Sequence, residues 1–303
     1  MRRPSSVAPC VVALLVVVCL AACRIEDDAS FRRASASRVT PLSPSGAALS
    51  PDDPAGDTLV PAGPAGVAIR RGRAIVLATR DSLPANVGNG LRCVSCHLDE
   101  GRRPHAMPWT GVYARFPQYR SRRDRVERLE DRINDCITRS LAGRALAVES
   151  PAMRDIVAYM AYVSRGVPVG AGVPGQGLDT VRTTERGESA RGKLVFTAQC
   201  ARCHGEHGEG TKRATPLWGP MSFSIGAGMA RWRAAASFVR HNMPNDRPES
   251  LTDAEAVDVA AFITSQRRPD FIGKELDWPR GNAPPDVAYR TNAAKPRRSA
   301  GGR

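Results

Sequence analysis

The sequence has few aromatic residues and no apolar run long enough to cross a membrane comfortably. Phe, Trp and Tyr make up 5% of the 303 residues, so side chains alone offer little bulk for large cores. The run CVVALLVVVCL, residues 10–20, is shorter than the roughly 20 residues that a spanning helix needs. This shortage favours an export signal over a membrane-embedded protein.

Acidic residues are also scarce relative to basic ones. The chain has 30 Asp and Glu against 44 Lys and Arg, a formal net charge of +14. Such an excess favours anionic partners: nucleic acid, membrane surfaces or small anions. An arginine-rich surface that is merely solvated would give the same count.

The first residues indicate the compartment. The basic MRRPSS is followed by the short apolar run and by LAAC, which ends at Cys23. This pattern resembles a bacterial lipoprotein signal, residues 1–22, with Cys23 as the lipidated residue; an uncleaved anchor helix is the alternative. Either way the chain is exported, so we expect no nucleic-acid partner. We expect a lipid anchor on the periplasmic side of a bacterial membrane, and Arg24 favours the outer membrane.

The two segments that flank the central part, residues 23–66 and 276–303, show no periodic pattern of hydrophobic residues. Residues 23–66 are rich in Ala, Ser, Pro, Gly and Asp, which is typical of a flexible tether. Residues 276–303 are interpreted as a loose basic tail.

Two C-x-x-C-H motifs stand in the central part, CVSCH and CARCH. This motif attaches haem c: two thiols add to the porphyrin vinyl groups, and the adjacent histidine reaches the iron. The sequence therefore predicts two covalently bound haems. The attachment residues are Cys93, Cys96, Cys200 and Cys203, and the proximal ligands are His97 and His204.

A zinc site or two disulfides are the rival interpretations of these cysteines. Paired zinc motifs usually lie about 15–20 residues apart, whereas Cys96 and Cys200 are 104 positions apart. Both rivals also leave the two following histidines without a role.

The haem motifs lie within an internal repeat. RRGRAIVLAT and ARGKLVFTAQ precede them, AMPWTG and ATPLWG follow them, and each half ends in a helical pattern, SPAMRDIVAYMAYV or LTDAEAVDVAAFIT. Thr252 and Glu255 form a predicted capping box. We expect a mostly α fold of two class I cytochrome c domains in tandem, with haem supplying much of each core. The predicted segments are domain 1 at 67–168, a linker at 169–187 and domain 2 at 188–275.

Each unit needs a sixth iron ligand. Met243 follows His204 by 39 residues, and Cys136 follows His97 by the same 39. The sequence therefore predicts Met243 on the second haem and a cysteine in the same position on the first. A buried free thiol is the plainer fate of a cysteine.

Other candidates remain for both haems. Met107 is an alternative for the first haem, and His241, Met229 and Met221 are alternatives for the second. His105 and His207 are interpreted as surface-loop residues.

A thiolate ligand lowers the potential of a haem and places a reactive sulfur at a redox centre. Seven arginines lie between residues 115 and 132, and acidic neighbours would pair with part of them on a helix surface. Arg132 and Ser140 each lie four positions from Cys136, so a helix would place them on its face. These residues favour an oxyanion substrate.

The pieces GNGLRCVSCH, RFPQYRSR, LEDRINDCITRS, PLWG, SFSIGAGMAR and FVRHNMP resemble the diheme thiosulfate dehydrogenases over residues 71–262. The resemblance implies coupling of two thiosulfates to tetrathionate, in either direction, with His/Cys ligation of the first haem. It also implies substrate binding by Arg122, Arg132 and Ser140. Electrons would leave through the His/Met haem to a separate periplasmic acceptor such as a small cytochrome c. Some members carry a lysine where this chain has Asn242.

Two other functions are compatible with parts of this pattern. A thiosulfate-transferase cytochrome subunit would share the cysteine-ligated haem but would need a partner cytochrome. A non-enzymatic diheme electron carrier would explain the repeat but not the cysteine.

Overall fold

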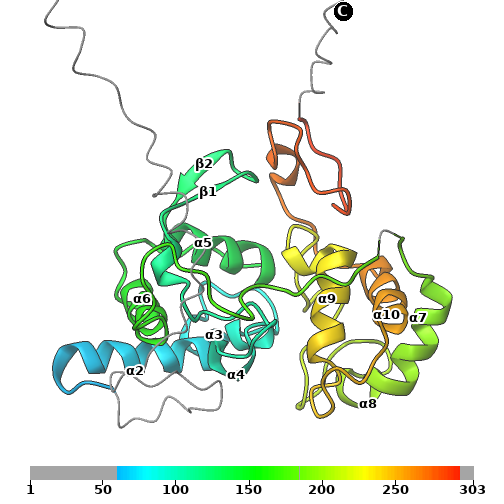
Figure 1. Cartoon of the computed structure of the whole chain (residues 1–303), viewed down its shortest axis with the longest axis horizontal. Coiled ribbons are helices and arrows are strands. Elements are labelled where there is room, and N and C mark those ends of the chain that lie inside the picture. The colour runs from blue at the N-terminus through cyan, green and yellow to red at the C-terminus, as the bar shows by residue number, and fades with distance from the viewer. Residues whose placement is uncertain (1–59, 184, 294–303) are drawn as a thin grey trace, which may run out of the picture. The chain divides into compact units, whose positions relative to one another are not determined.

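The computed structural model describes residues 60–183 and 185–293 (Figure 1). The predicted signal, Cys23 and most of the predicted tether lie outside these residues. Within the described ranges, no helix has the length and apolar character needed to span a bilayer.

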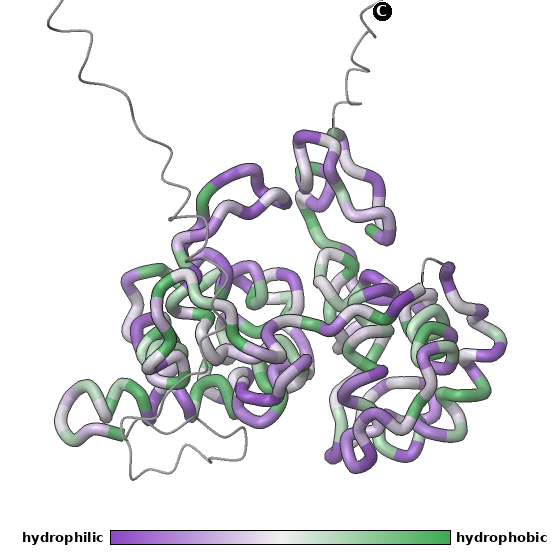
Figure 2. Tube along the Cα trace, viewed as in Figure 1, coloured by the Kyte–Doolittle hydropathy of each residue, from purple (hydrophilic) through white to green (hydrophobic). Residues whose placement is uncertain are grey.

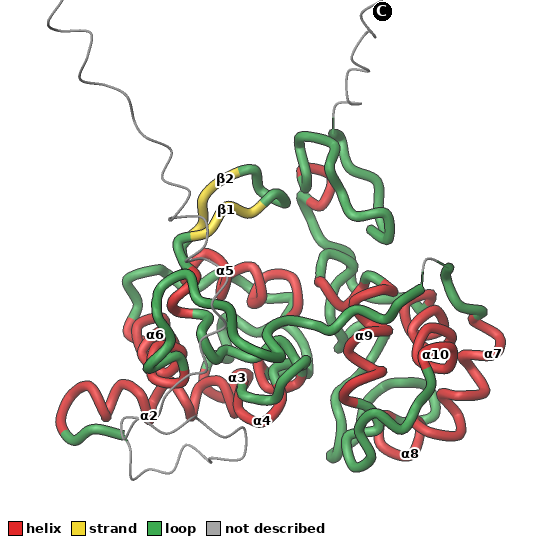
Figure 3. The backbone as a smooth tube through the Cα atoms, viewed as in Figure 1, coloured by secondary structure: helices red, strands yellow, loops and turns green. Residues whose placement is uncertain are grey.

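Helices and loops form nearly all of the described chain, with one small hairpin (Figure 3). The α-helices and strands are α2 (Gly63–Leu77), α3 (Thr79–Ser82), α4 (Leu98–Gly101), β1 (Gln118–Arg120), β2 (Arg125–Glu127), α5 (Leu129–Asp135), α6 (Pro151–Val163), α7 (Ser189–Val195), α8 (Ala201–His204), α9 (Trp232–Asn242) and α10 (Asp253–Ser265). Short 3₁₀ turns span Cys93–Ser95, Tyr113–Arg115, Gly228–Ala230 and Lys274–Leu276, and π-helical turns span Cys136–Ser140 and Phe196–Cys200.

The same helix crossing occurs in both halves. Gly72 of α2 lies so close to α6 that a Cβ would come 1.9 Å from the backbone oxygen of Asp155. Gly192 of α7 meets Asp258 of α10 at the same 1.9 Å. The arginine before each glycine binds the aspartate carboxylate, at 2.8 Å in the first half and 2.7 Å in the second. The predicted repeat is therefore a repeat of tertiary packing.

The predicted terminal helices are confirmed as α6 and α10. Ser150 caps α6 by accepting a hydrogen bond from the Met153 amide, and Thr252 and Glu255 form the predicted capping box of α10. Buried side chains from α2, α5 and α6 join in the first core cluster. The second half has smaller clusters, in which α10 packs against α9 and α7.

We expected the arginine-rich stretch to lie on a helix surface. It instead forms a hairpin followed by a helix. Strands β1 and β2 pair antiparallel with Gln118 opposite Glu127, and their tube is mainly hydrophilic (Figure 2). Helix α5 starts only after Arg128, whose amide donates to Asp131 at 3.0 Å. This cap fixes the start of the helix because the Asp131 carboxylate satisfies an amide that helix hydrogen bonds leave free.

A loop of the second half completes the first core. Phe223, Ala227 and Ala230 belong to the same buried cluster as α2, α5 and α6. Buried Asn89 joins the two halves by donating to the Ser140 carbonyl of the first half at 2.8 Å and to the Ser222 carbonyl of this loop at 3.0 Å. The first site is therefore built from both halves of the chain.

The two predicted outer segments are shorter than expected. Helix α2 starts at Gly63, and Val60 packs on the first core, so the tether prediction is wrong for residues 60–66. The loose-tail prediction is wrong for residues 277–289, because Asp277, Trp278 and Asp286 are buried. Asp277 forms an ion pair with buried Arg139 of the first half, which ties this segment down.

Candidate active site

The first haem motif presents its histidine in a fixed orientation. The Nδ1 atom of His97 lies 2.7 Å from the carbonyl oxygen of Met107. Since a carbonyl can only accept, Nδ1 carries the proton and Nε2 keeps its lone pair for a metal. The ring lies 4.9 Å from the Trp109 ring, centre to centre. Met107 thus holds the His97 ring through its backbone carbonyl.

The second motif repeats this arrangement. The Nδ1 atom of His204 lies 2.8 Å from the carbonyl oxygen of Thr215. In both halves the accepting residue directly precedes the proline of the repeated loop. Burial lowers the pKa of His204, which favours the neutral, ligating imidazole.

The motif cysteines fit thioether attachment to haem c. All five cysteines of the described residues are free thiols. Burial raises the pKa of Cys93 to about 11, of Cys96 to about 12 and of Cys200 to about 11. No group of three or more His, Cys, Asp or Glu within residues 60–183 and 185–293 is placed to hold a metal ion. The zinc interpretation therefore finds no ligand set there, and the disulfide interpretation is wrong for these cysteines.

Cys136 is a different kind of thiol. It begins the π-helical turn that follows α5, a geometry often found at functional sites. Arg132, one turn earlier, donates from Nη1 to its sulfur at 2.9 Å, so the two residues share a face as predicted. Burial alone would raise the pKa of Cys136, but the Arg132 charge and the His97 ring outweigh burial and lower it to about 7. His97 and Cys136, far apart in sequence, thus meet.

Ser140 lies at the other end of the same π-helical turn. It is half-buried, and among the described residues its hydroxyl has no hydrogen-bond partner. Its backbone carbonyl is held by Asn89. A fixed backbone with an available hydroxyl suits an oxyanion ligand.

The candidates for the second haem separate clearly in space. Met243 packs in the cluster that contains Cys200, Leu217 and Trp218. The His241 ring instead lies 5.2 Å from the His105 ring, centre to centre. Met229 packs both on the first core and on a small cluster of the second half that contains Trp232, and Met221 is exposed. His207 is exposed as predicted, whereas His105 is half-buried.

Three of the seven arginines at 115–132 are ion-paired. Arg123, Arg125 and Arg128 contact carboxylates. Within the described residues, the remaining four, which include Arg122 and Arg132, have no carboxylate within 4.0 Å. The prediction that acidic neighbours neutralise part of this cluster is confirmed, and unpaired positive charge remains beside Cys136.

Arg122 extends this charge from the tip of the hairpin. Its Nη1 donates to the Gly226 carbonyl at 2.9 Å, and its guanidinium lies 4.5 Å above the centre of the Trp278 ring. Burial, followed by the nearby charge of Arg139, lowers the pKa of Arg122 to about 10, so it remains cationic at neutral pH. No local sequence signal predicts Trp278, which lies 156 positions away.

Arg120 is a further cation that the sequence did not single out. Burial and the charge of Arg132 lower the pKa of Arg120. Its Nη1 donates to the amide oxygen of Gln118 at 3.1 Å.

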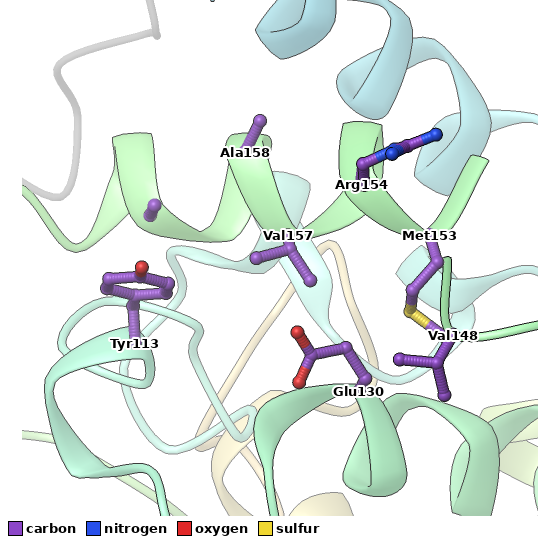
Figure 4. Close-up of a pocket in the computed structure, with 8 residues that line it drawn as sticks. Tyr113, Glu130, Val148, Met153, Arg154, Val157 and Ala158 are labelled. Atoms are coloured by element: carbon purple, nitrogen blue, oxygen red, sulfur yellow. The ribbon is translucent and has the colours of Figure 1, made fainter. Parts of the chain in front are cut away.

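A cavity of about 240 Å³ between α5 and α6 lies apart from these groups (Figure 4). Glu130, Arg154 and Val157 are among the residues that line it, and none of the predicted site residues does.

The fold and the two histidine sites define a tandem cytochrome c protein, for which haem c is the implied cofactor. The family model SoxA/TsdA, cytochrome c domain, matches residues 85–169. The model Cytochrome C oxidase, cbb3-type, subunit III, matches residues 187–263.

Comparison with known proteins narrows this class. A thiosulfate dehydrogenase of Allochromatium vinosum is 46% identical over 214 residues, covering 67% of this chain and 79% of that protein. One of Psychrobacter arcticus is 42% identical over 226 residues, covering 73% and 69%. The chain belongs to the diheme thiosulfate dehydrogenases, cytochromes that oxidise thiosulfate.

A solved structure has the same architecture. Thiosulfate dehydrogenase (TsdBA) from Marichromatium purpuratum aligns with a TM-score of 0.69 at 31% identity. The alignment covers 84% of this chain and 55% of that chain, so this chain spans little more than half of that protein.

Proposed function

We propose that this enzyme couples two thiosulfates into tetrathionate beside Cys136. In this reaction, two S₂O₃²⁻ ions become one S₄O₆²⁻ ion and two electrons, one sulfur–sulfur bond forms, and no proton moves. The same site would run the reverse reaction with two electrons supplied. The observation that carries the proposal is the meeting of Cys136, Arg132 and His97.

Four residues of this chain would act on the substrate. Arg132 and Arg122 would bind the anionic oxygens, since a guanidinium donates several N–H groups in one plane. The Ser140 hydroxyl would donate a further hydrogen bond. The Cys136 thiolate would form a bond to the outer sulfur of one thiosulfate as two electrons leave. A second thiosulfate would then attack that sulfur, release tetrathionate and restore the thiolate.

Two haems would be bound through the four motif cysteines, and when bound they supply the one-electron redox chemistry that removes both electrons. The first would have His97 and Cys136 as iron ligands, and the second His204 and Met243. Met243 packs on the same core cluster as Cys200, whereas the His241 ring lies against the His105 ring, which supports Met243 over His241.

The surroundings of the enzyme are also part of the proposal. We place it on the periplasmic side of a bacterial membrane, anchored through a lipid on Cys23, with the outer membrane favoured. A separate periplasmic carrier such as a small cytochrome c would accept the electrons. The signal pattern in residues 1–23 supports the anchor.

Turnover of the purified chain with thiosulfate and an artificial electron acceptor tests the function directly. Cys136→Met should abolish most tetrathionate formation but keep two haems per chain, because attachment does not use Cys136. The potential of the first haem should rise, because thioether donates less charge to ferric iron than thiolate. Electron paramagnetic resonance should show a low-spin thiolate signal that disappears in the variant. Tetrathionate formation at the wild-type rate by Cys136→Met would refute the proposal.

A matched arginine pair tests the substrate contacts. Arg132→Ala should raise KM for thiosulfate by roughly ten- to a hundredfold, the value of a charge-assisted hydrogen bond of about 1.5–3 kcal/mol. Arg128→Ala is the control, because Arg128 is exposed and paired with Asp131 at 3.7 Å. Equal effects would mean that the arginines act only as a diffuse field. No turnover by the chain alone, with transfer of thiosulfate to a carrier cysteine, would favour the transferase alternative.

A further inference from the structure

The chain returns to the first site at its C-terminal end. Residues 277–289, here called the C-terminal strap, follow the last 3₁₀ turn and lie beside the tip of the β1–β2 hairpin (Figure 1). Asp277 and Trp278 are each only 4% exposed. A segment with a buried aspartate and a buried tryptophan is a packed element of the fold.

The strap is anchored by a buried ion pair. Arg139 donates from both Nη atoms to Asp277, at 2.8 and 2.7 Å, and Tyr289 donates its hydroxyl to the same carboxylate at 2.5 Å. Further along, Asp286 accepts from the backbone amide of Arg233 at 3.1 Å. The strap is thus fastened to both halves of the chain.

From these anchors the strap holds the hairpin tip at three points. The Trp278 amide donates to the Arg122 carbonyl at 2.8 Å. The Arg122 guanidinium lies over the Trp278 ring at 4.5 Å from its centre. Arg280 pairs with Asp124 at 2.6 Å. Both the backbone and the side chain of Arg122 are therefore fixed by the same tryptophan.

This packing leaves most N–H groups of the Arg122 guanidinium without a hydrogen-bond partner among the described residues. Among the described residues, its side chain forms one hydrogen bond, from Nη1 to the Gly226 carbonyl, and no carboxylate lies within 4.0 Å of it. A ring fixes the plane of a guanidinium while its edge remains free for an anion. Trp278 also adopts φ +51°, a region rare for a bulky residue, so surrounding contacts hold it in this conformation.

We infer that Trp278 is a positioning residue, which orients Arg122 for thiosulfate and makes the C-terminal strap part of the substrate site. The inference rests on the proposed function, because it takes Arg122 as a substrate ligand. An arginine that is already ordered loses less freedom on binding, so its contact yields more net affinity. The effect should therefore appear in substrate binding and leave the redox centres unchanged.

Two substitutions at Trp278 in the holoenzyme distinguish the effect of its aromatic face on Arg122 from the effect of its side-chain volume. Trp278→Leu keeps an apolar side chain but removes the aromatic face, and Trp278→Phe keeps a face. We expect Trp278→Leu to raise KM for thiosulfate about three- to tenfold, with kcat within about twofold and both haem spectra unchanged. Trp278→Phe should restore most of the affinity. Asp246→Asn, which breaks the exposed Arg202–Asp246 ion pair outside the strap, is the control and should leave KM near wild type.

The decisive comparison includes Arg122→Ala alone and in combination. If Trp278 acts through Arg122, adding Trp278→Leu to Arg122→Ala should raise KM no further. A raised KM in Arg122→Ala with a normal KM in Trp278→Leu overturns the inference and leaves the proposed function intact. A normal KM in Arg122→Ala refutes Arg122 as a ligand, and the inference falls with it. Equal KM values for the Leu and Phe variants, or additive effects, also overturn it.

Discussion

The Arg139–Asp277 pair gives a sharp test of how the C-terminal segment is held. Both side chains are 5% exposed, and two hydrogen bonds of 2.8 and 2.7 Å join them. Asp277→Asn keeps the shape but removes the charge, and leaves a buried guanidinium without its main counter-charge. Removing one partner of a buried pair typically costs about 3–5 kcal/mol.

The surroundings of Arg139 set the expected value within this range. Its Nε lies 3.5 Å from Asp135, and its guanidinium lies 4.2 Å from the centre of the Phe271 ring. These contacts offset part of the loss, so we expect about 3 kcal/mol. For a protein of this size, about 2–4 °C of melting temperature corresponds to 1 kcal/mol. The unfolding midpoint should therefore fall by about 6–12 °C.

Thermal unfolding of the oxidised holoprotein, followed by circular dichroism, measures this shift. The control is Asp246→Asn, which breaks the Arg202–Asp246 pair. That pair has the same 2.7 Å contact, but its side chains are 50% and 58% exposed. Exposed pairs contribute little, so the control should barely move the midpoint. Equal shifts, or an unchanged midpoint in Asp277→Asn, would refute the claim that burial of this pair holds the segment.

Three further predictions address other parts of the chain. Gly192→Ala should destabilise the second half, because the new Cβ would lie 1.9 Å from a backbone oxygen of α10. Gly228→Ala is the control and should not destabilise it, because a Cβ there would meet no atom within 4 Å. The melting temperatures of both variants test this prediction. Asn242→Leu should cost about 1–3 kcal/mol in denaturant unfolding, because it removes the hydrogen bond of 3.1 Å from buried Asn242 to the part-buried carbonyl of His105. Cys23→Ser should release the full-length protein into the soluble fraction, and a protein that stays on membranes would contradict the lipid anchor.

Short-range sequence patterns predicted much of the site. A C-x-x-C-H motif is local because one porphyrin reaches both thiols and the histidine, and α6 and α10 followed from helical periodicity. The matched 39-residue spacing predicted Cys136 as the counterpart of Met243, and the structure brings Cys136 to His97. The four-residue step to Arg132 needed only the helical repeat, and the 2.9 Å contact bears it out.

The β1–β2 hairpin could not be predicted from local sequence patterns. The charges of residues 118–127 fit a salt-bridged helix as well as two short strands, since charge spacing alone does not distinguish them. The choice depends on contacts that the stretch makes elsewhere, such as Arg122 with Trp278 and Asp124 with Arg280.

By itself, the sequence determined the two haem motifs, the tandem units and the cysteine opposite His97, because each depends on spacing within one unit. Only the tertiary structure decided which arginines remain unpaired, that the loop at Gly226 reaches the first site, and that the C-terminal strap packs beneath Arg122. A polar residue such as Asp277 is read from sequence as solvated, because exposure is the usual fate of a charge. Its burial depends on Arg139, 138 positions away, and a contact of that range leaves no periodic trace in a single sequence.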